Sequence, residues 1–213
     1  ILYYGASGAP ARLGFGTSGD FLKTQGTGAN PVWAAPASGD FVKVAETNIT
    51  STTASLTFDN SVITSTYNNY RLLMRNVVPE TDNTYLEGYI SDDNGVSWNT
   101  SSIYYRSIIC TDDSSGSNAY EARFSALAYM IIGSAAGQGT AAGENLCCAV
   151  DFHNVHSTTH QKFASVNGYF VDYNGDGRTV LGGWRFATTD KIDAIKLSNG
   201  IDYGDFVLYG IKD

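Results

Sequence analysis

Six acidic residues are the side chains of this 213-residue chain that could carry out catalysis. A glycosidase needs two carboxylates that meet in space about 5 to 10 Å apart, and their positions in the sequence are free. All of the candidates except Glu121 lie in turn-like segments, where an acidic residue commonly stabilises the turn and is solvated. No nucleophile elbow, phosphate loop, zincin motif or dinucleotide fingerprint accompanies them. We therefore predict that the chain is not an enzyme. The six are Asp92, Asp93, Asp112, Asp113, Glu121 and Asp176.

The three histidines, His153, His156 and His160, all lie in the stretch DFHNVHSTTH and could be metal ligands. On an extended strand, His153 and His156 point to opposite faces, and the turn-like residues 157–159 direct His160 elsewhere. Only Asp151 supplies a carboxylate at ligand spacing. We predict no metal site and no cofactor, and the alternative is a symmetric oligomer that gathers the histidines at its axis.

Two turn motifs have known uses in other proteins. The segment SDDNGVSW (residues 91–98) has the spacing of an Asp-box, in which Asp and Ser side chains bond to the turn backbone and a Trp packs beneath it. The segment DYNGDG (residues 172–177) begins like a calcium-binding loop, but its twelfth position is Gly183, where such a loop has a bidentate Glu. We interpret both motifs as structural turns, so Trp98 is assigned to packing.

The composition predicts an all-β protein. Aromatic residues make up 13% of the chain, charged residues make up 16%, and 23 Gly against 4 Pro supply many turns. Strand-length runs separated by Asp, Asn, Gly and Ser begin near residue 39, with no amphipathic helix between them, which indicates an antiparallel β-sandwich of jelly-roll type. The expected strands are 40–46, 54–58, 70–77, 84–91, 103–109, 119–132, 145–152, 162–169, 178–187, 194–197 and 205–211.

Charge and hydropathy restrict the partners. The formal net charge of −8 repels a phosphate backbone and so disfavours nucleic acid as a partner. The longest apolar run, residues 126–133, is too short to cross a membrane. Cys110, Cys147 and Cys148 do not form a disulfide framework, so we expect three reduced, buried thiols, in keeping with assembly in a cytoplasm. The chain begins at Ile1 without Met or a charged leader, so we expect it to be a piece of something longer.

Residues 1–36 differ from the rest of the chain in composition and in the length of their apolar segments. Short apolar patches, each too small to form a core, alternate there with Gly, Ala, Thr and Ser, and Trp33 is assigned to packing. The hexapeptide SGDFLK (residues 18–23) returns as SGDFVK (residues 38–43), which suggests a repeated element that becomes buried by stacking or by pairing with other chains. The alternative is a coincidence between two strand starts.

Two regions of the chain resemble bacteriophage fibre proteins. The N-terminus is similar to a segment common in tail-fibre shafts, although position 20 is Asp where that pattern often has Gln, through LYY (2–4), ARL (11–13), GTSGDFLK (16–23) and NPVWA (30–34). The remainder is similar to a β-sandwich domain often found at the distal end of such fibres, through YNNYRLLMRNVVP (67–79), SDDNGVSW (91–98), IDAIKL (192–197) and GDFVLYGI (204–211).

The resemblance implies a fibre stem at residues 1–36, a head domain at residues 37–213, and a homotrimer. It also implies a location in the virion, as a tail or capsid fibre assembled in the host cytoplasm, with other virion proteins as partners and with binding to a bacterial surface glycan. Two alternatives remain: a structural or decoration fibre without receptor binding, and a polysaccharide-cleaving tailspike. Aromatic and polar loop residues are the candidate glycan contacts, namely Tyr104, Tyr105, Asp112, Asp113, Tyr173, Asn174 and Asp176.

Overall fold

The computed structural model describes residues 1–5, 8–36, 39–101, 103–112, 119–132 and 137–212, with backbone alone for 112 and 119–126. The chain divides into two compact units, Ile1–Gly39 and Asp40–Asp213. The sequence placed this boundary three residues earlier, between residues 36 and 37.

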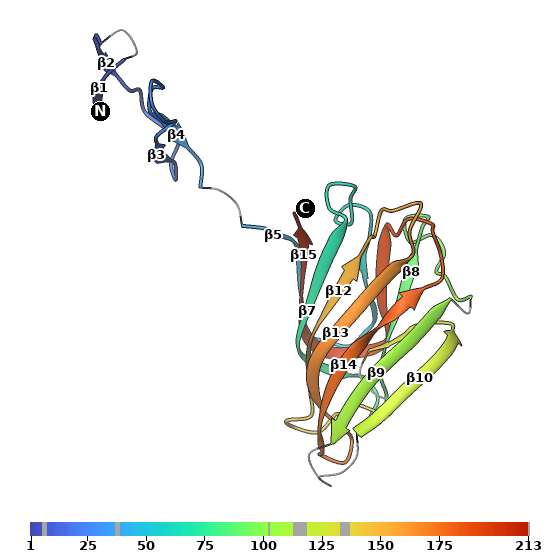
Figure 1. Ribbon diagram of the computed structural model, residues 1–213. Helices are drawn as coiled ribbons and strands as arrows, with labels where there is room; N and C mark the ends of the chain where they lie inside the picture. The colour runs from blue at the N-terminus through green and yellow to red at the C-terminus, as the bar shows by residue number, and fades with distance from the viewer. Residues whose placement is uncertain (6–7, 37–38, 102, 113–118, 133–136, 213) are drawn as a thin grey trace. The chain divides into compact units, whose positions relative to one another are not determined.

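The smaller unit consists of two short hairpins (Figure 1). Strand β1 (Leu2–Tyr4) pairs with β2 (Pro10–Arg12), and β3 (Phe21–Lys23) pairs with β4 (Val32–Ala34). The indole of Trp33 in β4 donates a hydrogen bond at 2.7 Å to the carbonyl of Gly14, which lies in the segment between the two hairpins. None of the described side chains of this unit is buried, so the unit has no core of its own.

The larger unit is an antiparallel β structure, which confirms the predicted all-β class. Eight strands follow one another in the order β10-β9-β14-β13-β12-β7-β15-β5, and β15 also pairs with β6 and β8, the latter followed by β11. The sheet thereby turns over on itself through β15 into a sandwich-like arrangement (Figure 1). The strands are β5 (Phe41–Ile49), β6 (Thr53–Phe58), β7 (Asn69–Pro79), β8 (Leu86–Ser91), β9 (Tyr104–Asp112), β10 (Ala119–Leu127), β11 (Met130–Ile132), β12 (Leu146–His153), β13 (Lys162–Val171), β14 (Gly177–Phe186) and β15 (Ala194–Ile211).

The prediction divides the chain into strands wrongly at two places. The run 119–132 is two strands, because β10 pairs with β9 whereas β11 pairs with β8. The predicted strands 194–197 and 205–211 are one strand, β15, whose irregular middle contains Asn199, Gly200 and Gly204 at φ values of 84°, 77° and 155°. Such bulges bend a strand without ending its pairing, so turn residues here mark a change of partner.

Alternation along the strands separates a buried face from a solvent face. Strand β13 follows this period, with alternate side chains entering the core and Phe163, Ser165 and Asn167 facing outward. The same alternation buries Cys110 and Cys148 and exposes Cys147, so the expectation of three buried thiols is wrong for Cys147.

Candidate functional site

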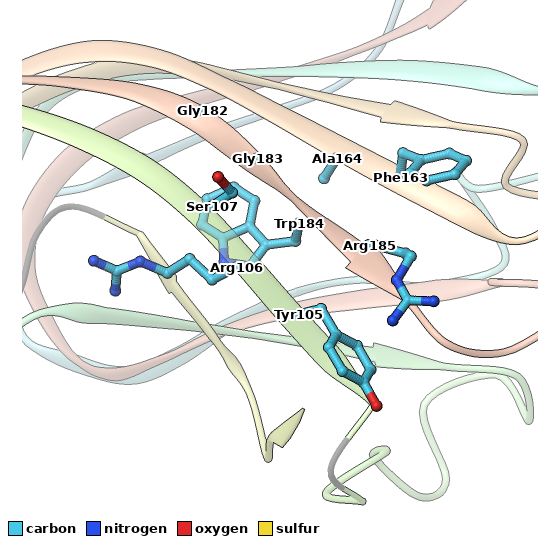
Figure 2. Close-up of a pocket in the computed structure, with 9 residues that line it drawn as sticks. All are labelled: Tyr105, Arg106, Ser107, Phe163, Ala164, Gly182, Gly183, Trp184 and Arg185. Atoms are coloured by element: carbon cyan, nitrogen blue, oxygen red, sulfur yellow. The ribbon is translucent and has the colours of Figure 1, made fainter. Parts of the chain in front are cut away.

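A shallow groove crosses the outward face of strands β9, β14 and β13 (Figure 2). It consists of two adjoining hollows of about 440 and about 580 Å³, both lined by Gly182, and the second extends over β12 and β7. Neighbouring strands lie about 4.8 Å apart, so five strands give the groove a span of roughly 19 Å. That length suits an extended ligand.

The register of the strands places two contrasting rows of side chains side by side. One row is low because its side chains are small: Gly183 pairs with Ser107 on one neighbouring strand and with Ser165 on the other. The next row is tall because its side chains are large: Arg185, two residues further along β14, pairs with Tyr105 and Phe163. Phe163 is 45% exposed, so an apolar ring stands beside a polar floor.

Two glycines keep the floor of the groove open. A Cβ on Gly183 would lie 2.3 Å from the carbonyl oxygen of Ala164. Gly182 has a φ of 151°, and its Cβ would lie 2.2 Å from the carbonyl oxygen of Ser107 and 2.7 Å from Cα of Ile108. Both obstructions are backbone atoms, so neither position accommodates a side chain without movement of the sheet.

The guanidinium of Arg185 is held against the ring of Tyr105. Its Cζ lies 4.1 Å from the centroid of that ring, within the range of a cation–π contact. Nη1 of Arg185 also donates a hydrogen bond to Oε1 of Gln161 at 3.3 Å. An arginine has five N–H donors, so most of them remain available to a ligand.

An ion pair closes the far end of the groove. Nε and Nη2 of Arg71 donate hydrogen bonds to Oδ1 and Oδ2 of Asp151 at 2.6 and 2.8 Å. This bond to Asp151 raises the pKa of Arg71 above its usual value. Asp151 is the only carboxylate lining either hollow within the described chain. Among its described residues, the groove therefore offers polar contacts but no pair of carboxylates for glycoside hydrolysis.

Of the two tyrosines predicted as glycan contacts near the start of β9, Tyr105 lines the groove and Tyr104 is buried. The side chain of Tyr104 is 0% exposed, and its hydroxyl accepts a hydrogen bond from the amide of Ile90 at 3.1 Å and donates one to the carbonyl of Asn99 at 2.8 Å. The prediction for Tyr104 is wrong, because period-two alternation turns one of two adjacent tyrosines inward.

The other predicted contacts lie at the opposite end of these strands. Tyr173, Asn174 and Asp176 belong to the turn between β13 and β14. Asp112 ends β9 and pairs in register with Arg178, close to that turn, whereas Asp113 lies outside the described residues. The structure thus separates Tyr105 from Asp112 and from the turn that contains Tyr173, Asn174 and Asp176.

Sequence reasoning missed the remaining residues of the groove. Phe163, Ser165 and Asn167 stand at alternate positions of a strand, and the residues between them, Ala164 and Val166, are apolar, a pattern that marks an outward face. The Gly-Gly pair at 182–183 inside a strand pattern signals a close backbone approach. Neither signal shows that the two segments are neighbours.

The structure gives both turn motifs a structural role. In the Asp-box, Oδ1 of Asp93 accepts hydrogen bonds from Ser91 Oγ at 2.7 Å and from the amide of Ser97 at 2.9 Å, and Gly95 has a φ of 81°. In the second motif, the buried Oδ1 of Asp172 accepts hydrogen bonds from the amides of Asn174 and Asp176 at 2.9 and 3.0 Å.

The three histidines differ in environment. His160 is exposed, and its Nδ1 lies 2.9 Å from Thr159 Oγ1, whereas His153 and His156 are half-buried. Burial lowers the pKa of His156 below its usual value. Across the described part of the chain, no three His, Cys, Asp or Glu side chains gather as a metal site would require.

No family model matches the chain, and neither curated proteins nor solved structures show a significant match to it. The described residues contain no helix that is long and apolar enough to cross a bilayer.

Proposed function

We propose that the chain is a fibre-type virion protein that attaches to the bacterial surface by binding a glycan in the groove. The supporting observation is the row of Tyr105, Arg185 and Phe163 standing beside the low row of Ser107, Gly183 and Ser165. Aromatic rings pack against the apolar face of a pyranose, and hydroxyl, amide and guanidinium groups bond to its hydroxyls. A rigid sheet carries these groups, which fits recognition without chemistry.

We also propose that the chain is a homotrimer held together at its N-terminal unit, where other virion proteins also attach. Leu2, Tyr4 and Phe15 are 79%, 78% and 94% exposed in the isolated chain. A unit without a core that exposes such side chains gains stability by burying them against other chains. Three copies in a fibre stem would provide that burial.

A pair of matched variants tests glycan binding. Phe163 and Tyr169 lie on the same face of β13, and both are 45% exposed, but only Phe163 lines the groove. Binding of the whole protein to host cells and to their purified surface polysaccharide is measured for Phe163→Ala and Tyr169→Ala. We expect Phe163→Ala to weaken binding about tenfold or more and Tyr169→Ala to leave it unchanged. Equal loss in both variants, or no polysaccharide binding by the parent protein, refutes the proposal.

The trimer is tested by light scattering on the whole chain and on residues 40–213. We expect the mass of three chains for the whole protein and a lower oligomeric state after removal of residues 1–39. A monomer in both cases contradicts the proposal.

One observation favours the alternative of a structural or decoration fibre. Leu181, which lines the second hollow, pairs with Ile109 of β9, and the two side chains are 52% and 46% exposed, which suits contact with a protein. A decoration protein attaches to virus particles and ignores cells, so the same binding assay with particles in place of cells separates the two functions.

A further inference from the structure

Arg185 is the cation that the groove presents to a ligand. Its side chain is exposed, the Tyr105 ring supports one face of the guanidinium, and Gln161 accepts one hydrogen bond from it. Within the part of the chain that the structure describes, no carboxylate lies at ion-pair distance from Arg185.

The other charged side chains of the groove are either paired with each other or buried. Arg71 and Asp151 neutralise each other through two hydrogen bonds. Arg106 also lines the groove (Figure 2), but it is only 3% exposed, because its position in β9 alternates with outward-facing residues. Among the described residues that line the groove, Arg185 is therefore the one exposed cation without an ion-pair partner, in a chain whose formal net charge is −8.

We propose that the groove selects an acidic saccharide, with Arg185 binding its acid group. The acid group is a carboxylate or a phosphate, which share the geometry that a guanidinium fork recognises with two parallel hydrogen bonds. This inference rests on the proposed glycan binding and specifies the class of glycan.

The surroundings of Arg185 prepare it for this role. Stacking on Tyr105 holds the guanidinium plane before a ligand arrives, so less side-chain entropy is lost on binding. Phe163 stands on the next strand, in register with Arg185, where its exposed ring can contact the apolar face of the same sugar. The exposed Asn167 continues the groove with an amide that can bond to hydroxyls of the neighbouring sugar.

The experiment measures binding of the whole protein to an array of acidic and neutral bacterial surface polysaccharides. Each acidic polysaccharide is also printed after carboxyl reduction and, separately, after dephosphorylation. The variants are Arg185→Gln and Arg185→Lys, and the control is Arg75→Gln, which removes an exposed arginine of β7 outside the groove. Thermal unfolding of each variant checks that it is folded.

We expect the parent protein to bind an acidic polysaccharide and to lose about tenfold or more in affinity when its acid group is removed. Arg185→Gln should lose the same factor on the acidic form and show no further loss on the neutralised form. Arg185→Lys should recover part of the affinity, and Arg75→Gln should behave as the parent. Loss on carboxyl reduction identifies a carboxylate, and loss on dephosphorylation identifies a phosphate.

Two other results have different meanings. Groove-dependent binding to neutral polysaccharides, or an Arg185→Gln variant that still distinguishes acidic from neutralised forms, overturns this inference and leaves the proposed function standing. Binding to no polysaccharide at all refutes the proposed function as well.

Discussion

The turn between β13 and β14 depends on one buried carboxylate, and replacing it should destabilise the larger unit measurably. The side chain of Asp172 is 0% exposed. Its Oδ2 lies 2.7 Å from Nη2 of Arg178, a side chain that is 16% exposed, and its Oδ1 accepts the two amide hydrogen bonds of the turn. Asp172→Asn keeps the shape and one acceptor but removes the charge opposite Arg178.

The magnitude follows from removing the carboxylate charge that pairs with Arg178. Breaking a buried ion pair by removing one partner costs about 3 to 5 kcal/mol. Arg178 keeps some contact with water, so we expect the lower end, about 3 kcal/mol, for Asp172→Asn. Asp172→Ala also loses the turn hydrogen bonds and should approach about 5 kcal/mol. Either loss is a large part of the roughly 5 to 15 kcal/mol that stabilises a typical domain.

The loss should depend on pH in a defined direction. Burial alone would raise the pKa of Asp172, but the hydrogen bonds from Arg178 and from the turn amides outweigh it and bring the pKa below its usual value. A carboxyl with a lowered pKa stabilises the fold above its unfolded pKa of about 4, and that stability disappears as the pH falls through the folded value. The difference between the parent protein and Asp172→Asn should therefore shrink below about pH 4.

Urea unfolding followed by fluorescence between pH 7 and pH 3 measures both effects. Asp176→Asn is the control, because Asp176 lies in the same turn, is half-buried and lines neither hollow of the groove. It should change the free energy of unfolding by less than about 0.5 kcal/mol. An Asp172→Asn protein as stable as the control at pH 7, or one whose deficit stays constant into acid, would refute this reasoning.

Three shorter predictions test other parts of the structure. Asp93→Ala should lower the Tm at pH 7 but not near pH 2, because hydrogen bonds from Ser97 lower the pKa of Asp93 to about 2; a pH-independent loss in thermal scans contradicts this. Cys147 is exposed and should react with a thiol reagent in the native protein, whereas Cys148, whose pKa is raised by burial, should react only after unfolding. Mass spectrometry of tryptic peptides measures the order of labelling, and simultaneous labelling of both cysteines contradicts this prediction. Gly182→Ala should cost more than about 1 kcal/mol in urea unfolding, because its φ is 151° and backbone atoms occupy the Cβ position; unchanged stability contradicts this.

Local signals predicted much of the fold. The alternation in residues 162–169 and 70–77 identifies strands β13 and β7 without any knowledge of their partners. The Asp-box was interpretable for the same reason, since Asp93 bonds to Ser91 and Ser97 within the same turn. Strands and turns that depend on residues close together in the sequence can therefore be predicted from the sequence.

The candidate site could not be predicted in the same way. Tyr105 and Arg185 are far apart in the sequence, and they meet only because β9 pairs with β14 in one particular register. The alternation shows that one of Tyr104 and Tyr105 must turn inward, but not which one. Likewise, Asn199 and Gly200 look like the end of a strand until the partners of β15 on both sides of the bulge are known.

Core and groove are specified by the same register, which restricts how the site can be altered. In β14, Trp184 faces the core with 2% exposure, and its neighbour Arg185 faces the groove. A slip of one residue would exchange them, burying a guanidinium and exposing an indole, so the core holds the groove residues in place. Substitutions at outward positions such as Phe163 and Arg185 should therefore change binding with little effect on folding. Substitutions at Gly182 and Gly183 should change both, and loss of binding in those variants says nothing about ligand contact.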